Sequence, residues 1–162
     1  MSSVSFLQAG FSEDLAIDYV CDLTGKIIQK NLHDSTSKKI FIRCNDAKQA
    51  IKLDERMWGY PKHIFIPHKI STEKNSKDCE VSISYPGIKN NEEFYYLVNL
   101  NPQLPSNYSE YKETLQIVIK DNSTNQEIAR ESYKKCLGDG IKPKYIEAVS
   151  YTHLTLPTIC SV

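Results

Sequence analysis

The residues best suited to bind an acidic ligand lie close together on one predicted helix. Arg130, Tyr133 and Lys134 occupy positions i, i+3 and i+4, so a helix would place all three on one face. Arginine can hold a terminal carboxylate, lysine can pair with neighbouring acids, and a tyrosine ring can wall an apolar pocket. An acidic peptide ending in a bulky apolar residue would suit this set, with Ile141 closing the pocket just past Gly140. On spacing alone, a solvated helix face is the more frequent explanation.

Motifs that would indicate an enzyme, a nucleotide site or a metal centre are weak. A phosphate loop should occupy the first strand-to-helix turn, but that turn holds Gly10 alone, and two acidic residues follow. His63 and His68 lie across a predicted strand and would face opposite sides, and the sequence has neither CxxC nor HExxH. Cys44 precedes a predicted helix, which can lower a thiol pKa, yet a buried structural thiol is the simpler interpretation. We therefore expect no catalytic residue, no metal and no cofactor.

The elements that must position these residues alternate between strands and helices. Apolar runs and alternating patterns predict strands, and helical spacing with capping residues predicts helices. The strands are expected at 3–8, 38–44, 63–68, 80–85, 94–100 and 115–119, and the helices at 13–30, 46–58 and 124–137. This order favours the α/β class: a single Rossmann-like three-layer domain with a largely parallel sheet and no phosphate-binding loop.

The composition argues against several broad classes of protein. The 162 residues include 20 basic and 20 acidic side chains, so the net charge is zero. A dedicated nucleic-acid coat needs a strongly basic face, although a small basic patch stays compatible with this balance. No apolar run approaches the roughly 18 residues that a membrane span needs. Five widely spaced cysteines and an N-terminal stretch unlike a secretory signal lead us to expect a cytoplasmic protein.

Residues 47–70 resemble the chi subunit of bacterial DNA polymerase III. The pattern is LDE-x-x-W, then a short gap and F-[hydrophobic]-P-H, preceded by Lys48-Gln49-Ala50. It is carried by Leu53, Asp54, Glu55, Trp58, Phe65, Pro67 and His68. A second block, IARESYKK at 128–135, resembles the C-terminal helix of that family, and Gly140 follows at the family's spacing. The order of elements fits from residue 3 to about residue 148.

The resemblance implies a non-catalytic accessory subunit of the clamp loader in DNA replication. Chi proteins pair with a small psi subunit, which connects them to the clamp-loader ATPase, and they bind the acidic C-terminal tail of single-stranded DNA-binding protein. Some chi proteins instead join an iron–sulfur helicase of the damage response through the surface that otherwise holds psi. DNA would then be approached indirectly, in the bacterial cytoplasm at the replication fork.

The resemblance also assigns two sets of residues to the partners. The tail of single-stranded DNA-binding protein would contact Arg130, Tyr133, Lys134, Gly140 and Ile141. The psi subunit or the helicase would contact Trp58, Phe65, Ile66, Pro67 and His68. Two positions depart from the family, which usually has an aromatic residue at Ile141 and often a basic one at Gln126. Both departures would weaken the contact with the tail.

Two other functions remain open on the residues alone. A small nucleotide- or phosphate-using α/β enzyme would bind nucleotide near Gly10. An autonomous binder of single-stranded nucleic acid would use Phe94, Tyr95 and Tyr96 as a stacking platform.

Residues 149–162 differ in character from the rest of the chain. They contain no charged residue and resemble the translated read-through of a sequencing adapter. We therefore expect a chi-like domain over 1–148 and a non-native tail over 149–162, the alternative being a genuine terminus of this protein. His153 and Cys160 are left out of the functional reasoning for this reason.

Overall fold

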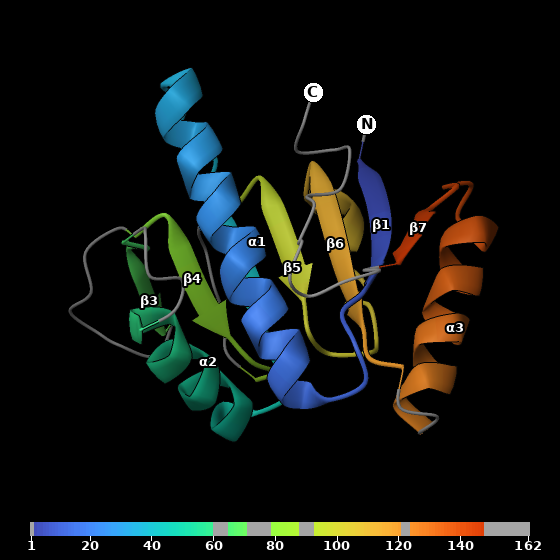
Figure 1. Cartoon of the computed structure of the whole chain (residues 1–162). Coiled ribbons are helices and arrows are strands. Elements are labelled where there is room, and N and C mark those ends of the chain that lie inside the picture. Colours follow the sequence, from blue (N-terminus) through green and yellow to red (C-terminus); the bar gives the residue numbers. More distant parts are fainter. Residues whose placement is uncertain (1, 60–64, 71–78, 88–92, 121–123, 148–162) are drawn as a thin grey trace.

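The chain folds around one seven-stranded sheet with α-helices on both faces (Figure 1). The computed structural model describes residues 2–59, 65–70, 79–87, 93–120 and 124–147. Within these residues the elements are β1 (Ser3–Gln8), α1 (Glu13–Asp34), β2 (Ile40–Arg43), α2 (Ala47–Gly59), β3 (His68–Ile70), β4 (Val81–Ser84), β5 (Tyr96–Asn99), the 3-10 helix η1 (Tyr108–Glu110), β6 (Glu113–Val118), α3 (Thr124–Gly138) and β7 (Lys144–Glu147). The α/β class is thus confirmed, as is the parallel sheet, since every strand pairing is parallel.

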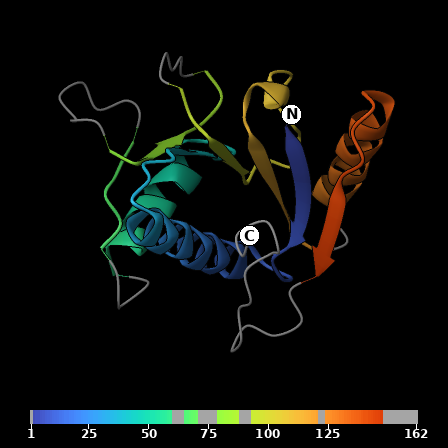
Figure 2. The ribbon, with the colours of Figure 1, turned by 90° about the horizontal axis from the view of Figure 1, so that it is seen from above.

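The strand order explains why the helices lie on opposite faces. The order across the sheet is β3-β4-β2-β5-β6-β1-β7. The chain leaves β1 through α1 toward β2 in one direction, and leaves β6 through α3 toward β7 in the other. Because crossovers between parallel strands are right-handed, opposite directions place the two helices on opposite faces. Figure 2 shows this, with α1 and α2 on one side of β1 and α3 on the other.

Each face of the sheet has its own hydrophobic core, as expected for parallel strands covered on both sides. Alternate residues of the strands point to alternate faces. One set packs with α1 and α2, and its strand members include Leu7, Ile40, Ile42, Val81, Ile83, Val98, Leu115 and Ile117. The other set packs with Ala129 and Cys136 of α3, and its strand members are Val4, Phe6, Leu97 and Val118. No helix in the described part of the chain is long and apolar enough to cross a bilayer.

The strand predicted at 63–68 is misplaced. Residues 65–67 form no regular secondary structure, and β3 begins at His68, the last residue of the predicted strand. Ile66 accounts for the misleading pattern, because it is buried in the first core without belonging to a strand. Residues 60–64 lie outside the described residues.

The prediction that 115–119 forms the last strand is also wrong, because β7 follows α3. β7 lies at an edge of the sheet and pairs only with β1. Three of its four residues are exposed, so it lacks the apolar alternation that marks a half-buried strand. The predicted domain limit at Ala148 and the predicted tail over 149–162 lie outside the described residues.

Two buried thiols provide a test of the first core. Burial, with Asp46 and Glu13 nearby, raises the pKa of Cys44 to about 12, and burial with Asp18 nearby raises that of Cys21 to about 12. Both thiols therefore stay protonated and shielded near neutral pH. We predict that iodoacetamide at about pH 8 leaves both unmodified in the folded protein and modifies both in urea, as read by peptide mass spectrometry. Rapid labelling of Cys44 in the folded protein would contradict this packing.

Candidate functional site

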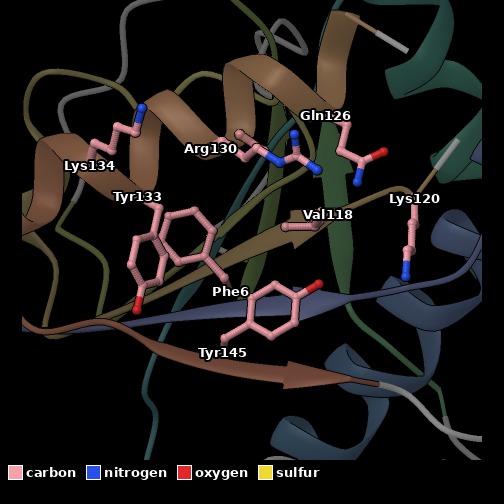
Figure 3. Close-up of a pocket in the computed structure, with 9 residues that line it drawn as sticks. Phe6, Val118, Lys120, Gln126, Arg130, Tyr133, Lys134 and Tyr145 are labelled. Carbon is pink, nitrogen blue, oxygen red and sulfur yellow. The ribbon is translucent and has the colours of Figure 1, made fainter. Parts of the chain in front are cut away.

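A pocket of about 440 Å³ lies between α3 and the sheet at β1, β6 and β7 (Figure 3). This α3 pocket brings together Arg130, Tyr133 and Lys134, as the helical spacing predicts. It is lined by Phe6, Val118, Lys120, Gln126, Ala129, Arg130, Tyr133, Lys134 and Tyr145. Arginine and lysine therefore stand at a concave surface that also has aromatic walls, which a plain solvated helix face would not have.

Aromatic rings from three elements form the apolar part of the α3 pocket. Phe6 of β1 meets Tyr133 of α3 edge to face, with ring centroids 5.2 Å apart. The Tyr133 hydroxyl donates to the carbonyl of Pro143 at 3.5 Å. Tyr145 of β7 donates to Oε1 of Gln8 at 3.3 Å. Burial and the Glu147 carboxylate raise the pKa of Tyr145, although Arg130 acts in the opposite direction, so the phenol stays protonated.

The cations of the α3 pocket are accessible. Arg130 and Lys134 are exposed. Lys134 lies 3.6 Å from Glu131, with both side chains 73% exposed, and such a pair is worth only about 0–1 kcal/mol. An incoming carboxylate can therefore replace it at little cost. Lys120, just past β6, adds a third cation on the other side of Gln126 (Figure 3).

Gly140 and Ile141 are not among the residues that line the α3 pocket. Gly140 takes the left-handed conformation, with φ 82°, and closes α3. Its N–H donates to Leu137 at 3.1 Å, and the N–H of Ile141 donates to the carbonyl of Cys136 at 2.9 Å. This pair of bonds is a Schellman motif, in which Ile141 also packs on the second core. Both residues therefore fix the end of the helix that carries Tyr133.

The loop that joins β5 to β6 holds α3 in place. Ser132 Oγ donates to the carbonyl of Pro102 at 3.0 Å and accepts from the N–H of Leu104 at 3.3 Å. The hydroxyl of Tyr108 donates to Asp139 at 2.6 Å. These contacts connect the middle and the end of α3 to the rest of the domain, so the α3 pocket is formed between fixed elements.

A second candidate surface is formed by Trp58 of α2 and Phe65, which precedes β3. Their side chains are 62% and 68% exposed, and the ring centroids are 6.0 Å apart. Of the other residues predicted here, Ile66 and His68 are buried and Pro67 is partly buried. We call these two exposed rings the Trp58 surface. They lie on a support formed by buried residues of the same segment.

His68 is the centre of that support. Its Nδ1–H donates to the carbonyl of Ile66 at 2.8 Å, and its ring centroid lies 4.4 Å from that of Trp58. Its Nε2 atom lies 3.1 Å from Asp54 Oδ1, without the geometry of a hydrogen bond. Asp54 and Trp58 stand one helical turn apart, so both reach the same histidine.

The α3 pocket and the Trp58 surface lie at opposite ends of the sheet. β3 and β7 are its two edges (Figure 1). Six strand spacings of about 4.8 Å place these edges roughly 29 Å apart. The Trp58 surface belongs to α2 and to the segment just before β3, whereas the α3 pocket lies on the opposite face. The two candidate surfaces are therefore well separated on the domain.

Sequence reasoning missed several residues of the α3 pocket. Phe6 and Val118 lie on strands that were predicted, but which strands are neighbours is not visible in the sequence. Lys120 follows β6, and Tyr145 belongs to the edge strand that the sequence pattern did not reveal. For Lys120 and Tyr145 no local signal in the sequence could have indicated a place in the pocket.

The fold and the two separated surfaces define an α/β protein with a basic, aromatic-walled pocket at one end and an aromatic patch at the other. Residues 1–144 match the DNA polymerase III chi subunit family, HolC, so the chain belongs to that family and is similar to an accessory subunit of the replicative polymerase.

Two relatives are DNA polymerase III subunit chi of Haemophilus influenzae and of Escherichia coli. The first is 32% identical over 118 residues, which are 71% of this chain and 81% of the relative. The second is 30% identical over 99 residues, which are 61% of this chain and 67% of the relative. The resemblance to the chi family is thereby confirmed.

A solved structure with the same fold is the Mss116p DEAD-box helicase domain 2 bound to an RNA duplex. The TM-score is 0.60 at 10% sequence identity, and the match covers 90% of this chain and 64% of that one. At this identity the likeness concerns the fold alone.

The support beneath Trp58 can be tested by its effect on stability. We predict that His68→Ala lowers the free energy of unfolding by about 2 kcal/mol or more, because it leaves a cavity and unpartnered polar groups. Urea unfolding followed by circular dichroism measures this. The matched control is Glu55→Ala, which is exposed on α2, the helix that carries Trp58, and is expected to change stability by less than about 0.5 kcal/mol. Equal urea midpoints for His68→Ala and the wild type would contradict the assignment.

Proposed function

We propose that this chain is a non-catalytic accessory subunit that connects the clamp loader to single-stranded DNA-binding protein at the replication fork, in the bacterial cytoplasm. One observation carries the proposal. The chain of a chi family member has a basic, aromatic-walled pocket at one end of its sheet and an exposed aromatic pair at the other.

The α3 pocket would hold the acidic C-terminal tail of single-stranded DNA-binding protein. Arg130 would form two hydrogen bonds with the terminal carboxylate, as guanidinium groups commonly do. The apolar side chain of the last residue would enter between Phe6, Tyr133 and Tyr145. Acidic residues upstream would then pass the lysines at the rim of the pocket.

Lys120 compensates in this proposal for the departure at Gln126. Relatives often have a basic residue there, whereas Gln126 is neutral. Lys120 lies beside Gln126 in the same pocket and comes from the end of β6 rather than from α3 (Figure 3). A positive charge is thus available at this end of the pocket through a different element of the fold.

The Trp58 surface would hold the psi subunit, or in its place an iron–sulfur helicase of the damage response. Exposed tryptophan and other aromatic residues often dominate the energy of protein interfaces. Trp58 is kept in one orientation by His68, which reduces the conformational freedom it would lose on binding. The two partners would compete, since each would need the same pair of rings.

The function would follow from linking two contacts. Each alone can be of modest strength, because holding both on one chain raises the effective concentration of one partner near the other. DNA would be reached through the protein that coats it, which agrees with a net charge of zero.

The first turn offers no support for the alternative of a phosphate-using enzyme. The carbonyl of Gly10 accepts from the N–H of Lys120 at 2.8 Å. Lys52 pairs with Glu13 and Asp14, so two carboxylates stand where a phosphate would have to approach. Such a turn presents negative charge to an incoming phosphate.

The tail contact can be tested with a labelled acidic peptide that ends in Ile-Pro-Phe. We predict that Arg130→Ala in the full chain weakens binding roughly tenfold to a hundredfold, because charge-assisted hydrogen bonds to the carboxylate are lost. Fluorescence anisotropy measures the affinity, and amidation of the peptide's C-terminus should cause a similar loss.

Lys135→Ala is the matched control for the tail contact. Lys135 lies on the same helix but is not among the residues that line the pocket, and its ammonium stands 6.0 Å from the ring of Tyr108. We expect this variant to bind like the wild type. Wild-type affinity in the folded Arg130→Ala variant, or equal affinity of the wild type for the free and the amidated peptide, would refute capture of the carboxylate by Arg130.

If psi binds the Trp58 surface, a substitution there should affect psi binding and not tail binding. Trp58→Ala should weaken psi binding about thirtyfold or more while tail binding is unchanged, because the exposed indole that psi would cover is lost. Isothermal titration measures psi binding. In the wild type, emission of Trp58, the single tryptophan, should shift to shorter wavelength when psi binds.

Leu32→Ala serves as the control for psi binding. Leu32 is a 70% exposed apolar residue on α1, remote from Phe65 in the sequence. Tight psi binding by Trp58→Ala, or an equal loss in Leu32→Ala, would show that this surface is not the interface.

A further inference from the structure

Another cavity, of about 810 Å³, opens at the amino ends of β2, β5 and β6. Lysines precede β2, aromatic residues precede β5, and one residue of each kind precedes β6. Those that line this amino-end cavity include Lys38, Lys39, Phe94, Tyr95, Tyr111 and Lys112. The strands bring them together, because the N–H of Tyr95 donates to Lys39 and the N–H of Lys112 donates to Tyr95, both at 3.0 Å. The α3 pocket is separate, since Val118 and Lys120 lie at the carboxyl end of β6.

Two aromatic rings of the amino-end cavity, Phe94 and Tyr111, pack against the ring of Phe41. Phe41 of β2 lies 5.0 Å from Phe94 and 6.1 Å from Tyr111, measured between ring centroids. The planes of Phe41 and Tyr111 differ by only 13°. Phe94 and Tyr111 are partly buried, so each has one part packed on the core and one part at the cavity. They are fixed, accessible aromatic surfaces that would lose little freedom on binding a ligand.

The charges around these rings favour an anion. Three lysines line the cavity against two glutamates, Glu93 and Glu110. The Glu110 carboxylate already accepts a hydrogen bond from Asn107 Nδ2 at 3.0 Å. Lys38 lies 4.6 Å above the centroid of the Tyr95 ring, which positions its ammonium at the cavity.

We propose that the amino-end cavity binds a short segment of single-stranded nucleic acid. Bases would stack on Phe94 and Tyr111, and the lysines would meet the phosphates. Aromatic faces accept any base, and cations beside them follow the backbone, which is how proteins bind single strands without sequence preference. An apolar peptide would use the rings but not the positive charge of the lysines.

This activity is independent of the proposed bridging function, because it uses other residues on other elements. It also agrees with the balanced charge of the chain. A patch of three lysines makes only a few phosphate contacts, so binding should be weak alone and effective once the protein is held next to a strand.

The test uses the full chain and a labelled oligothymidylate of about 15 nucleotides at low salt, without other proteins. Fluorescence anisotropy should show saturable binding. The logarithm of the affinity should fall with the logarithm of salt with a slope of about −2, as expected for three phosphate contacts to a single strand. The triple variant Lys38→Gln, Lys39→Gln, Lys112→Gln should bind about tenfold or more weakly and with a flatter slope.

Two further variants separate stacking from charge and this cavity from the α3 pocket. Phe94→Leu keeps an apolar side chain but removes the ring, and should weaken binding about fivefold or more. Lys134→Gln removes one lysine of the α3 pocket and should leave oligonucleotide binding unchanged while it weakens binding of the acidic peptide. Circular dichroism confirms that each variant is folded.

Each contrary result overturns a definite part of this inference. No saturable binding by the wild type at low salt rules out the site. Wild-type affinity in the triple lysine variant, or an equal loss in Lys134→Gln, places the contact elsewhere. An unchanged affinity in Phe94→Leu means a contact of charge alone, without base stacking. None of these results alters the test of tail capture, which is measured with a peptide.

Discussion

The right-handed crossover between parallel strands is the constraint on which both candidate surfaces depend. β1 and β6 are neighbours in the sheet, yet the chain leaves them in opposite directions. A fixed hand then sends α1 to one face and α3 to the other. The α3 pocket exists because α3 packs on that face beside β1, β6 and β7. The Trp58 surface exists because α2 continues the other layer to the far edge, where β3 begins. Separation of the two surfaces is thus a property of the topology.

The motif that resembles the chi family contains buried residues, which support the surface, and exposed residues, which would contact a partner. Leu53 is fully buried, and Ile66 and His68 are buried almost completely. Trp58 and Phe65 alone among the large hydrophobic residues of the segment 53–68 stand out from that support, as far as the structure describes it. Asp54 and the carbonyl of Ile66 hold His68, and His68 holds the indole of Trp58. The spacing of the motif therefore reflects one packed unit, in which a few buried residues determine where two exposed rings stand. The second block of the motif contains the same two kinds of residue. Gly140 is structural because it ends α3, whereas Arg130 is exposed on α3 and would contact the ligand.

Local pattern predicts the buried strands well and the edges poorly. β4 and β5 are buried along their whole length, and β2 alternates buried with partly buried residues, so their apolar or alternating patterns stand out in the sequence. β7 has one neighbour and three exposed residues, and nothing local distinguishes it from a loop. Some residues of the α3 pocket can likewise be predicted from local sequence pattern, and others cannot. Arg130, Tyr133 and Lys134 share a helix face that spacing alone reveals, whereas Lys120 and Tyr145 join them only through strand order. Strand order is set by contacts between distant parts of the chain, which a single sequence does not display.

The central claim is that one chain holds two partners at once through surfaces that do not interact. The direct measurement is a ternary binding experiment. The acidic tail peptide is fixed to a sensor surface, the full chain is bound to it, and the psi subunit is then passed over. We predict that psi binds the peptide-held chain with the affinity it has for the free chain, because the surfaces lie on opposite faces and at opposite edges of the sheet. Release of the chain by psi, or psi binding about tenfold weaker than to the free chain, would contradict independent surfaces and with them the bridging role.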